Sequence, residues 1–209
     1  MAAPLDVGPA QPVTLWDPIV RLTHWSIAIV VLLNAVLTEG GSGLHVWAGW
    51  AGMGLLVLRL IWGLLGPSEA RFSAFPPNAA AALAHLGALL SGRVREHPSH
   101  NPAGALMAYA LWAMLAVLTV TGLMMTGGKT PMQMDEIRAT VAAGDWSVLV
   151  EEGESGETDE GSGEIAKEVH EVAGNLILFL VLLHVAGVAV ESRALRRSLV
   201  RPMLFGRRK

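Results

Sequence analysis

The sequence predicts an all-α membrane protein in which four transmembrane helices form a bundle and both termini lie in the cytoplasm. Hydrophobic residues make up 52% of the 209 residues and charged residues only 16%, which is too apolar for an ordinary soluble domain. Four segments are long enough to cross a bilayer, since a helical crossing takes about 20 apolar residues. Lysine and arginine are concentrated in the segments that the bundle would place on one side of the membrane.

The four apolar segments and their connections define the expected elements in order. After a flexible N-terminal tail over residues 1–14, a membrane domain is expected over residues 15–191, with helices at about 19–37, 44–65, 102–126 and 165–190. The first connection, TEGGSG, is so short that the first two helices must form a tight antiparallel pair. The second connection contains AAAALAHLGALLSG, which predicts a short amphipathic helix at the membrane surface. In HNPAG, Asn101 and Pro102 are the residue types of an N-cap and a first helical turn.

The third connection and the C-terminal tail carry opposite charge. Residues 127–164 hold ten acidic residues against two basic ones, and the stretch VEEGESGETDEGSGE has the composition of a disordered, solvated loop. The tail over residues 192–209 carries seven basic residues. The positive-inside rule therefore places the tail and the second connection in the cytoplasm and the acidic loop on the outer side.

The absence of cysteine limits the kinds of cofactor site that the chain can form. It excludes a disulfide, a thiolate-held iron–sulfur cluster and a haem attached through a C-x-x-C-H site. Any metal or cofactor must be held by histidine, methionine or carboxylate groups.

Four of the seven histidines fall in the predicted membrane helices, and they are His24, His45, His170 and His184. Ionisable groups in a bilayer usually face the bundle interior and mark a functional pathway. Helix direction places His24 and His184 near the inner side of the membrane, and His45 and His170 near the outer side. Fourteen residues rise about 21 Å along a helix and end about 40° from a whole number of turns, so the two histidines of the fourth helix face the interior at two levels. The remaining three, His85, His97 and His100, are expected to be solvated or interfacial.

Two interpretations of the membrane histidines stay open on this pattern. Each one alone is most simply an isolated hydrogen-bonding residue, whereas two matched pairs at two depths are hard to obtain by accident. A zinc or copper site would need more ligands at one level. Two imidazoles that face each other across a planar macrocycle are what a six-coordinate b-type haem needs, and such ligation suits electron transfer because it leaves no open iron position.

Small and charged neighbours add weaker indications. Gly49 and Gly174 each follow a candidate ligand by four residues, where a small side chain would let a porphyrin lie against the helix, although such residues also serve helix packing. Arg59 is expected at the level of the inner pair. There it is either a partner for a haem propionate or a quinone, or an arginine that snorkels to the interface. Arg21 invites the same interpretation, and Arg71 is a further candidate near a quinone. Glu171 or Asn175 is expected to hydrogen-bond the outer pair.

Several stretches of the sequence resemble the bacterial cytochrome b561 family, and they are LWDPIVRLTHW, LHVWAGW, LRLIWGLLGPSEARFSAF, HNPAG, EVHEVAGNLILFLVLLHVAGV and SLVRPMLFGRRK. Within that family they are most similar to the b-type cytochrome subunits of nickel-dependent hydrogenases and their diheme-cytochrome-associated relatives. The resemblance runs from about Leu15 to Lys209. It implies a four-helix bundle that holds two non-covalent b haems, with His24 paired to His184 and His45 to His170.

The resemblance also implies a function and a location. We expect electron exchange in the bacterial inner membrane between the quinone pool, with ubiquinone as the candidate substrate, and a redox partner such as a periplasmic cytochrome c or a hydrogenase. A second copy of the chain is a further candidate partner, no nucleic acid is expected, and no catalytic residue is assigned. Two alternatives remain: a superoxide oxidase that passes electrons to quinone, and a haem-free membrane anchor or transporter.

Overall fold

The protein is all-helical throughout the part that the computed structural model describes, which comprises residues 17–93, 97, 100–148 and 160–206. The four long helices are α1 (Pro18–Leu32), α2 (Gly43–Leu65), α4 (Pro102–Met125) and α7 (Glu160–Ala194). The shorter elements are η1 (Leu33–Leu37), η2 (Ser68–Ala70), η3 (Phe72–Ala74), α3 (Ala79–Leu90), α5 (Pro131–Ala142) and α8 (Val200–Phe205). Each long helix, taken with η1 in the case of α1, is long and apolar enough to cross a membrane. The four long apolar helices that the sequence predicts are therefore present, which is consistent with a four-span membrane bundle.

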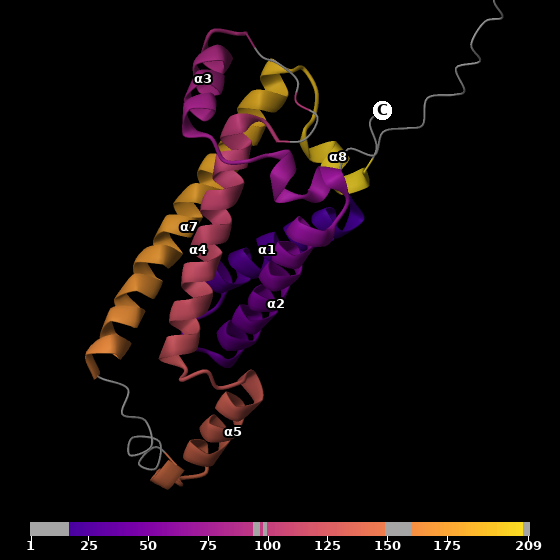
Figure 1. The fold of residues 1–209 in the computed structure, drawn as a ribbon. Coiled ribbons are helices and arrows are strands. Elements are labelled where there is room, and N and C mark those ends of the chain that lie inside the picture. The colour runs from indigo at the N-terminus through magenta and orange to yellow at the C-terminus, as the bar shows by residue number, and fades with distance from the viewer. Residues whose placement is uncertain (1–16, 94–96, 98–99, 149–159, 207–209) are drawn as a thin grey trace, which may run out of the picture.

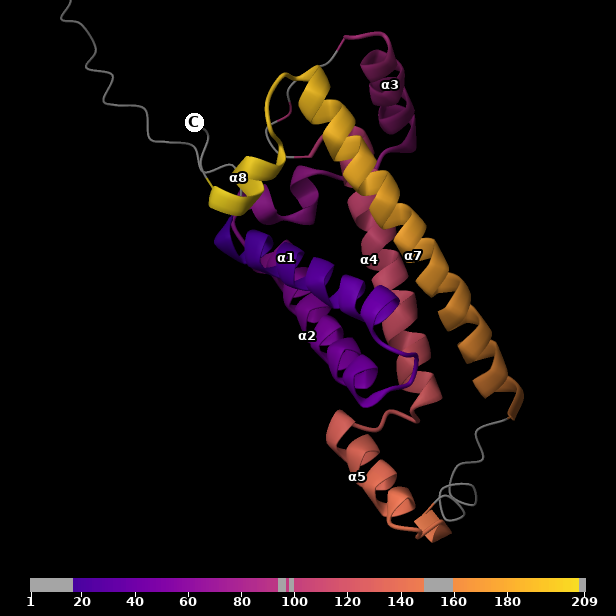
Figure 2. The same ribbon diagram turned by 180° about the vertical axis from the view of Figure 1, so that it is seen from behind.

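The long helices are arranged as two pairs (Figure 1). α1 packs along α2, α4 packs along α7, and α2 joins the pairs by packing against α4. α7 touches η1 but has little or no main-chain contact with α1 or α2. Figures 1 and 2 show α3 and α8 at one end of the bundle and α5 at the other. We call these the α8 end and the α5 end.

Side-chain caps explain where the long helices begin. The Asp17 carboxylate accepts hydrogen bonds from the first free main-chain amides of α1, and the Ser42 hydroxyl caps α2 in the same way. The Asn101 side chain caps α4, with Pro102 in the first turn, as the sequence predicts. Short polar residues thus mark the start of α1, α2 and α4.

The third connection contains a helix that the sequence analysis did not predict. α5 begins with a capping box in which Thr130 and Gln133 satisfy each other's main-chain amides. The Asp135 carboxylate accepts a hydrogen bond of 2.9 Å from the indole of Trp47, and Arg138 donates one of 2.7 Å to the carbonyl of Gly41. These bonds hold α5 beside the start of α2.

The stretch expected to be a disordered loop falls partly outside the described residues. Residues 149–159 are outside the described part of the chain, whereas residues 160–164 form the first turn of α7. The expected N-terminal tail over residues 1–14 is also outside the described part. α7 is therefore longer at both ends than the expected helix at about 165–190.

The basic tail also contains a short helix, α8, which is tied to α1. The Arg21 guanidinium donates to the carbonyl of Met203, at 3.1 Å, and to that of Leu204. The indole of Trp25 donates to the same Met203 carbonyl at 3.3 Å. Arginine commonly satisfies free carbonyls at a helix C-terminus in this way.

The buried core is thin for a chain of this length. Val20, Leu56 and Ile177 are among its few large apolar members, while Leu65 and Leu182 are 76% and 70% exposed. An apolar surface of this extent is expected where lipid takes the place of water.

Candidate functional site

The structure brings the four membrane histidines together in the two expected pairs. His24 of α1 and His184 of α7 have ring centres 6.3 Å apart, with ring planes inclined by 54°. His45 of α2 and His170 of α7 have ring centres 6.1 Å apart, inclined by 62°. In each pair, one ring comes from the α1–α2 pair of helices and the other from α7, across the side where those helices do not pack closely.

These separations fit one metal ion held between two imidazoles. With metal–nitrogen bonds of about 2.0–2.1 Å and about 1.1 Å from each ring nitrogen to its ring centre, two rings on opposite sides of an ion have centres about 6.2–6.4 Å apart. Both observed separations lie close to this range. Two histidines in direct hydrogen-bonded contact would have ring centres about 1 Å nearer, since an N–H···N contact spans about 3 Å between nitrogens.

An ion bound by side chains alone is a poorer fit. Among the residues that the structure describes, no group of three or more histidine, aspartate or glutamate side chains is placed to hold a metal. A structural zinc or copper site needs three or four such ligands, whereas an ion already bound in a macrocycle needs only two. The residues present therefore fit a haem iron better than a free ion.

The two pairs stand at different heights in the bundle. Fourteen residues separate His170 from His184 on α7, which corresponds to about 21 Å along the helix axis. The pair His24/His184 lies toward the α8 end, and the pair His45/His170 lies toward the α5 end. α7 supplies one imidazole to each.

Threonine hydroxyls contact both histidines of the pair toward the α5 end. Thr38 Oγ1 lies 3.2 Å from His45 Nδ1, and Thr121 Oγ1 lies 2.8 Å from His170 Nδ1. The threonines therefore stand at these nitrogens in place of the expected Glu171 or Asn175, and the Asn175 amide donates instead to the Glu171 main-chain carbonyl. Both expected residues lie on the same helix as His170, whereas the observed partners come from neighbouring segments, which a sequence alone does not align.

Glycines beside this pair keep its surroundings open. A methyl group on Gly122 of α4 would lie 3.5 Å from His170 Cε1, so the ring packs directly against that helix. A methyl group on Gly174 would meet nothing within 4 Å, and one on Gly49 would meet only Asn34 Nδ2, at 3.8 Å. The positions one turn from both imidazoles thus leave space for a flat group. Gly122 is a site residue that the sequence analysis missed.

The pair toward the α8 end has a different environment. His24 Nδ1 is buried without a hydrogen-bond partner, and its ring packs edge-on against Trp25 at 5.2 Å. His100 lies nearby, with its ring 4.3 Å from that of Phe75. Burial, with the positive charge of Arg59 as the next cause, lowers the pKa of His100 to about 4. Of the two surroundings expected for His100, solvated or interfacial, the first is not observed, because the ring is half-buried against Phe75.

Arg59 is buried beside this pair, with only 4% of its surface exposed. Its guanidinium carbon lies 4.8 Å from the ring centre of Trp112 and 5.3 Å from that of Phe72, and Nη2 donates to the Ala70 carbonyl at 3.3 Å. Nη1 is buried without a hydrogen-bond partner. The side chain does not extend to the surface as a snorkelling arginine would. A buried, incompletely paired cation favours an anionic or carbonyl ligand.

Two other candidate arginines are occupied by the main chain. Arg21 binds the carbonyls at the end of α8, as described above, and Arg71 Nε donates to the Gly66 carbonyl at 2.7 Å. Both therefore hold the loops at the α8 end together.

Polar groups away from the two pairs form smaller clusters. His85 is buried rather than solvated, with Nε2 at 3.7 Å from the Glu191 carboxylate, which also accepts from Asn101. The His97 ring lies against the His85 ring, with ring centres 5.4 Å apart.

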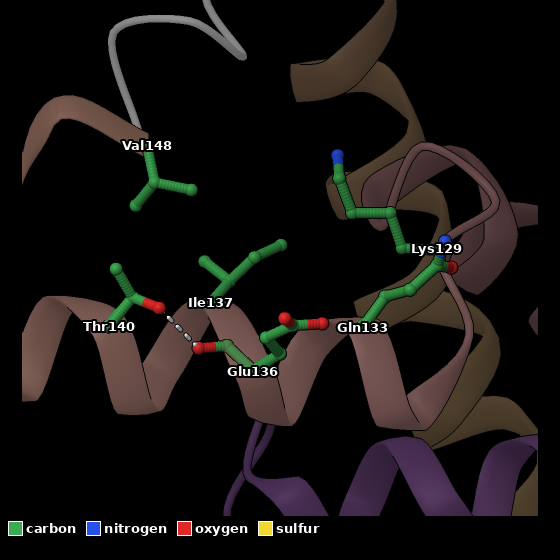
Figure 3. Close-up of a pocket in the computed structure, with 6 residues that line it drawn as sticks. All are labelled: Lys129, Gln133, Glu136, Ile137, Thr140 and Val148. Carbon is green, nitrogen blue, oxygen red and sulfur yellow. Dashed lines mark hydrogen bonds between the residues drawn. The ribbon is translucent and has the colours of Figure 1, made fainter.

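Beside α5, a surface hollow of about 290 Å³ is lined by Lys129, Gln133, Glu136, Ile137, Thr140 and Val148 (Figure 3). None of the four paired histidines lines it.

Comparison with known proteins agrees with this geometry. The family model for prokaryotic cytochrome b561 matches residues 15–206. No curated protein and no solved structure matches the chain significantly. With four apolar helices and a family match over nearly its whole length, the chain belongs to the prokaryotic cytochrome b561 family, which implies a multi-pass membrane b-type cytochrome that binds haem b and transfers electrons.

Proposed function

We propose that the protein is a two-haem b-type cytochrome of the bacterial cytoplasmic membrane that passes electrons between the quinone pool and a redox partner protein. The observation that supports this most strongly is the presence of two facing histidine pairs at two heights, each with a ring separation that fits an iron between the imidazoles. His24 with His184 would hold one haem, and His45 with His170 the other.

The residues of the chain would act by fixing the two irons and their surroundings. A bound haem supplies a one-electron couple, and two imidazoles per iron leave no position for oxygen or substrate. Because α7 would provide a ligand to both sites, the fourteen residues between His170 and His184 would set their spacing, at about 21 Å between ligand positions. The low polarity of the bundle and the hydrogen bonds to the ligands would set the potentials.

We further propose that the α8 end faces the cytoplasm and the α5 end faces outward. Arg71, Arg93, Arg193, Arg196 and Arg201 gather at the α8 end, as the positive-inside rule requires of a cytoplasmic side. The acidic third connection would then lie outside, where its charge suits a basic periplasmic cytochrome. Arg59 supports a propionate or quinone contact near the inner pair.

The absorption spectrum of the purified full-length protein, together with its haem-to-protein ratio, tests this proposal. We expect a haem b spectrum and two haems per chain. Replacing His45 or His170 by alanine should remove one haem, replacing His24 or His184 the other, and the doubly substituted His45/His184 chain should bind neither.

His97→Ala is the matched control, because His97 belongs to neither pair and should leave both haems in place. A protein without haem would refute the proposal outright. Retention of two haems in all four single variants would refute the ligand assignment while leaving the cytochrome function standing.

A further inference from the structure

The two histidine pairs differ in the hydrogen-bond partners of the Nδ1 atoms of their rings. In the pair toward the α5 end, both Nδ1 atoms lie against a threonine hydroxyl, from Thr38 in one case and Thr121 in the other. In the pair toward the α8 end, His24 Nδ1 is buried without a hydrogen-bond partner. The two sites are therefore not equivalent in ligand support.

The hydroxyl of Thr121 has a second partner besides the ring, and this favours one tautomer of His170. A threonine hydroxyl has one proton and two lone pairs. Thr121 Oγ1 donates to the Val117 carbonyl at 2.8 Å, one helical turn earlier, so a lone pair faces His170. In this arrangement His170 Nδ1–H can donate to the hydroxyl at 2.8 Å, which is the tautomer that leaves the free lone pair on Nε2.

Thr38 repeats this arrangement on His45. Its hydroxyl donates to the Asn34 carbonyl at 3.3 Å and faces His45 Nδ1 at 3.2 Å. The Asn34 amide in turn donates to the main-chain carbonyl of His45 at 3.2 Å. Both contacts thus suit rings that have Nδ1 protonated and Nε2 available to a metal.

Local main-chain features place the two hydroxyls. η1 is a π-helical turn, closed by the Thr38 amide on the Leu33 carbonyl at 3.0 Å, and single π-turns often mark functional positions. It sets Thr38 and Asn34 facing the start of α2. On α4, Thr121 is only 7% exposed and is followed by Gly122, where a Cβ would lie in ordinary contact with the His170 ring, at 3.5 Å from Cε1.

We propose that Thr38 and Thr121 are positioning residues that fix the ring orientation and proton position of His45 and His170 and thereby tune that iron site selectively. This rests on the proposed function, because it takes these two histidines as ligands. A hydrogen bond donated by Nδ1–H makes the imidazole a stronger electron donor. A stronger donor stabilises the ferric state, so the two hydroxyls lower the reduction potential of this site.

The test is a redox titration of the full-length, haem-loaded protein, followed through its absorption bands. Thr38→Val and Thr121→Val keep side-chain shape and remove the acceptor, and Thr121→Ser restores it. We expect each valine variant to raise one of the two potentials, and the double variant to raise it most, by about tenfold in the reduction equilibrium, or about 59 mV for one electron. The haem of that site should also be lost about 10-fold to 100-fold more readily.

Thr126→Val is the matched control. Its hydroxyl makes the same kind of bonds on α4, to the carbonyl four residues earlier at 3.1 Å and to the one three residues earlier at 3.3 Å. Among the described residues it has no hydrogen bond to a histidine. This control and Thr121→Ser should both titrate like the unaltered protein. The affected step should be the one that disappears on replacing His45.

Unchanged potentials in both valine variants would overturn this inference, as would a shift in the step that depends on His24. In either case a protein with two haems would leave the proposed function intact. A protein that contains no haem would overturn both.

Discussion

Gly63 of α2 lies against the ring of Phe72, and adding one methyl group there should disturb the α8 end of the bundle. A Cβ at this position would lie 2.2, 2.4 and 2.6 Å from three atoms of the Phe72 ring. Ordinary contact begins at 3.4 Å, so the ring would have to move by about 1.2 Å. It cannot do so freely, because Trp112 lies at 5.2 Å and Tyr109 at 5.9 Å between ring centres.

The expected cost follows from overpacking a filled site. Forcing an extra methyl group into such a contact typically costs about 1–3 kcal/mol. For a chain of about 200 residues this corresponds to a fall in melting temperature of about 2–12 °C. Because the Phe72 ring packs under Arg59, the same change should alter the site beside His24 and His184 more than the other pair.

Thermal unfolding in detergent, with the haem absorption as a second signal, measures both effects of Gly63→Ala. Gly87→Ala is the control, since a methyl group on this exposed α3 glycine would meet nothing within 4 Å. The control should melt like the unaltered protein or slightly higher, by helix propensity alone. Equal melting temperatures for the two variants would show that the packing argument is mistaken.

Three further outcomes are expected. Arg59→Met removes a buried charge at similar side-chain volume. If the guanidinium binds a propionate or quinone, haem retention near His24 or the rate of quinone reduction should fall. An unchanged or stabilised protein with full activity would show that the guanidinium binds neither. The chain has no cysteine, so single cysteines can report which end of the bundle faces outward. In intact cells, a membrane-impermeant maleimide should label Ala143→Cys at the α5 end and should not label Ser91→Cys at the α8 end. The reverse labelling pattern would show that the proposed orientation is inverted. Burial, with the Arg59 charge second, lowers the pKa of His100 to about 4 from 6.5. The unfolded chain therefore binds more protons between these values, so stability should fall as pH drops from about 6.5 to about 4, and His100→Gln should flatten this dependence.

Local pattern in the sequence was sufficient to predict several features of this protein. Apolar length predicted the four spans, and Asn101 with Pro102 marked the start of α4. The fourteen-residue spacing of His170 and His184 predicted two heights on one helix. Because the first two helices are joined by a short connection and run antiparallel, His24 was expected at the height of His184 and His45 at the height of His170. These inferences succeed because helical rise and bilayer thickness are fixed quantities.

One local signal was present in the sequence but was overlooked. The TPMQ stretch contains the capping box that begins α5, yet the acidic composition of the whole connection favoured a loop. Average composition conceals a short helix when most of the charged residues lie C-terminal to it, as they do here.

Contacts between segments far apart in sequence were decided only by the tertiary structure. The hydroxyls of Thr38 and Thr121 reach His45 and His170 from other elements, in place of the expected neighbours on α7. The closeness of Phe72 to Gly63 likewise depends on how η3 folds back over α2. Such contacts depend on helix rotation and loop path to within about 1 Å, and helical periodicity specifies a face but not that distance.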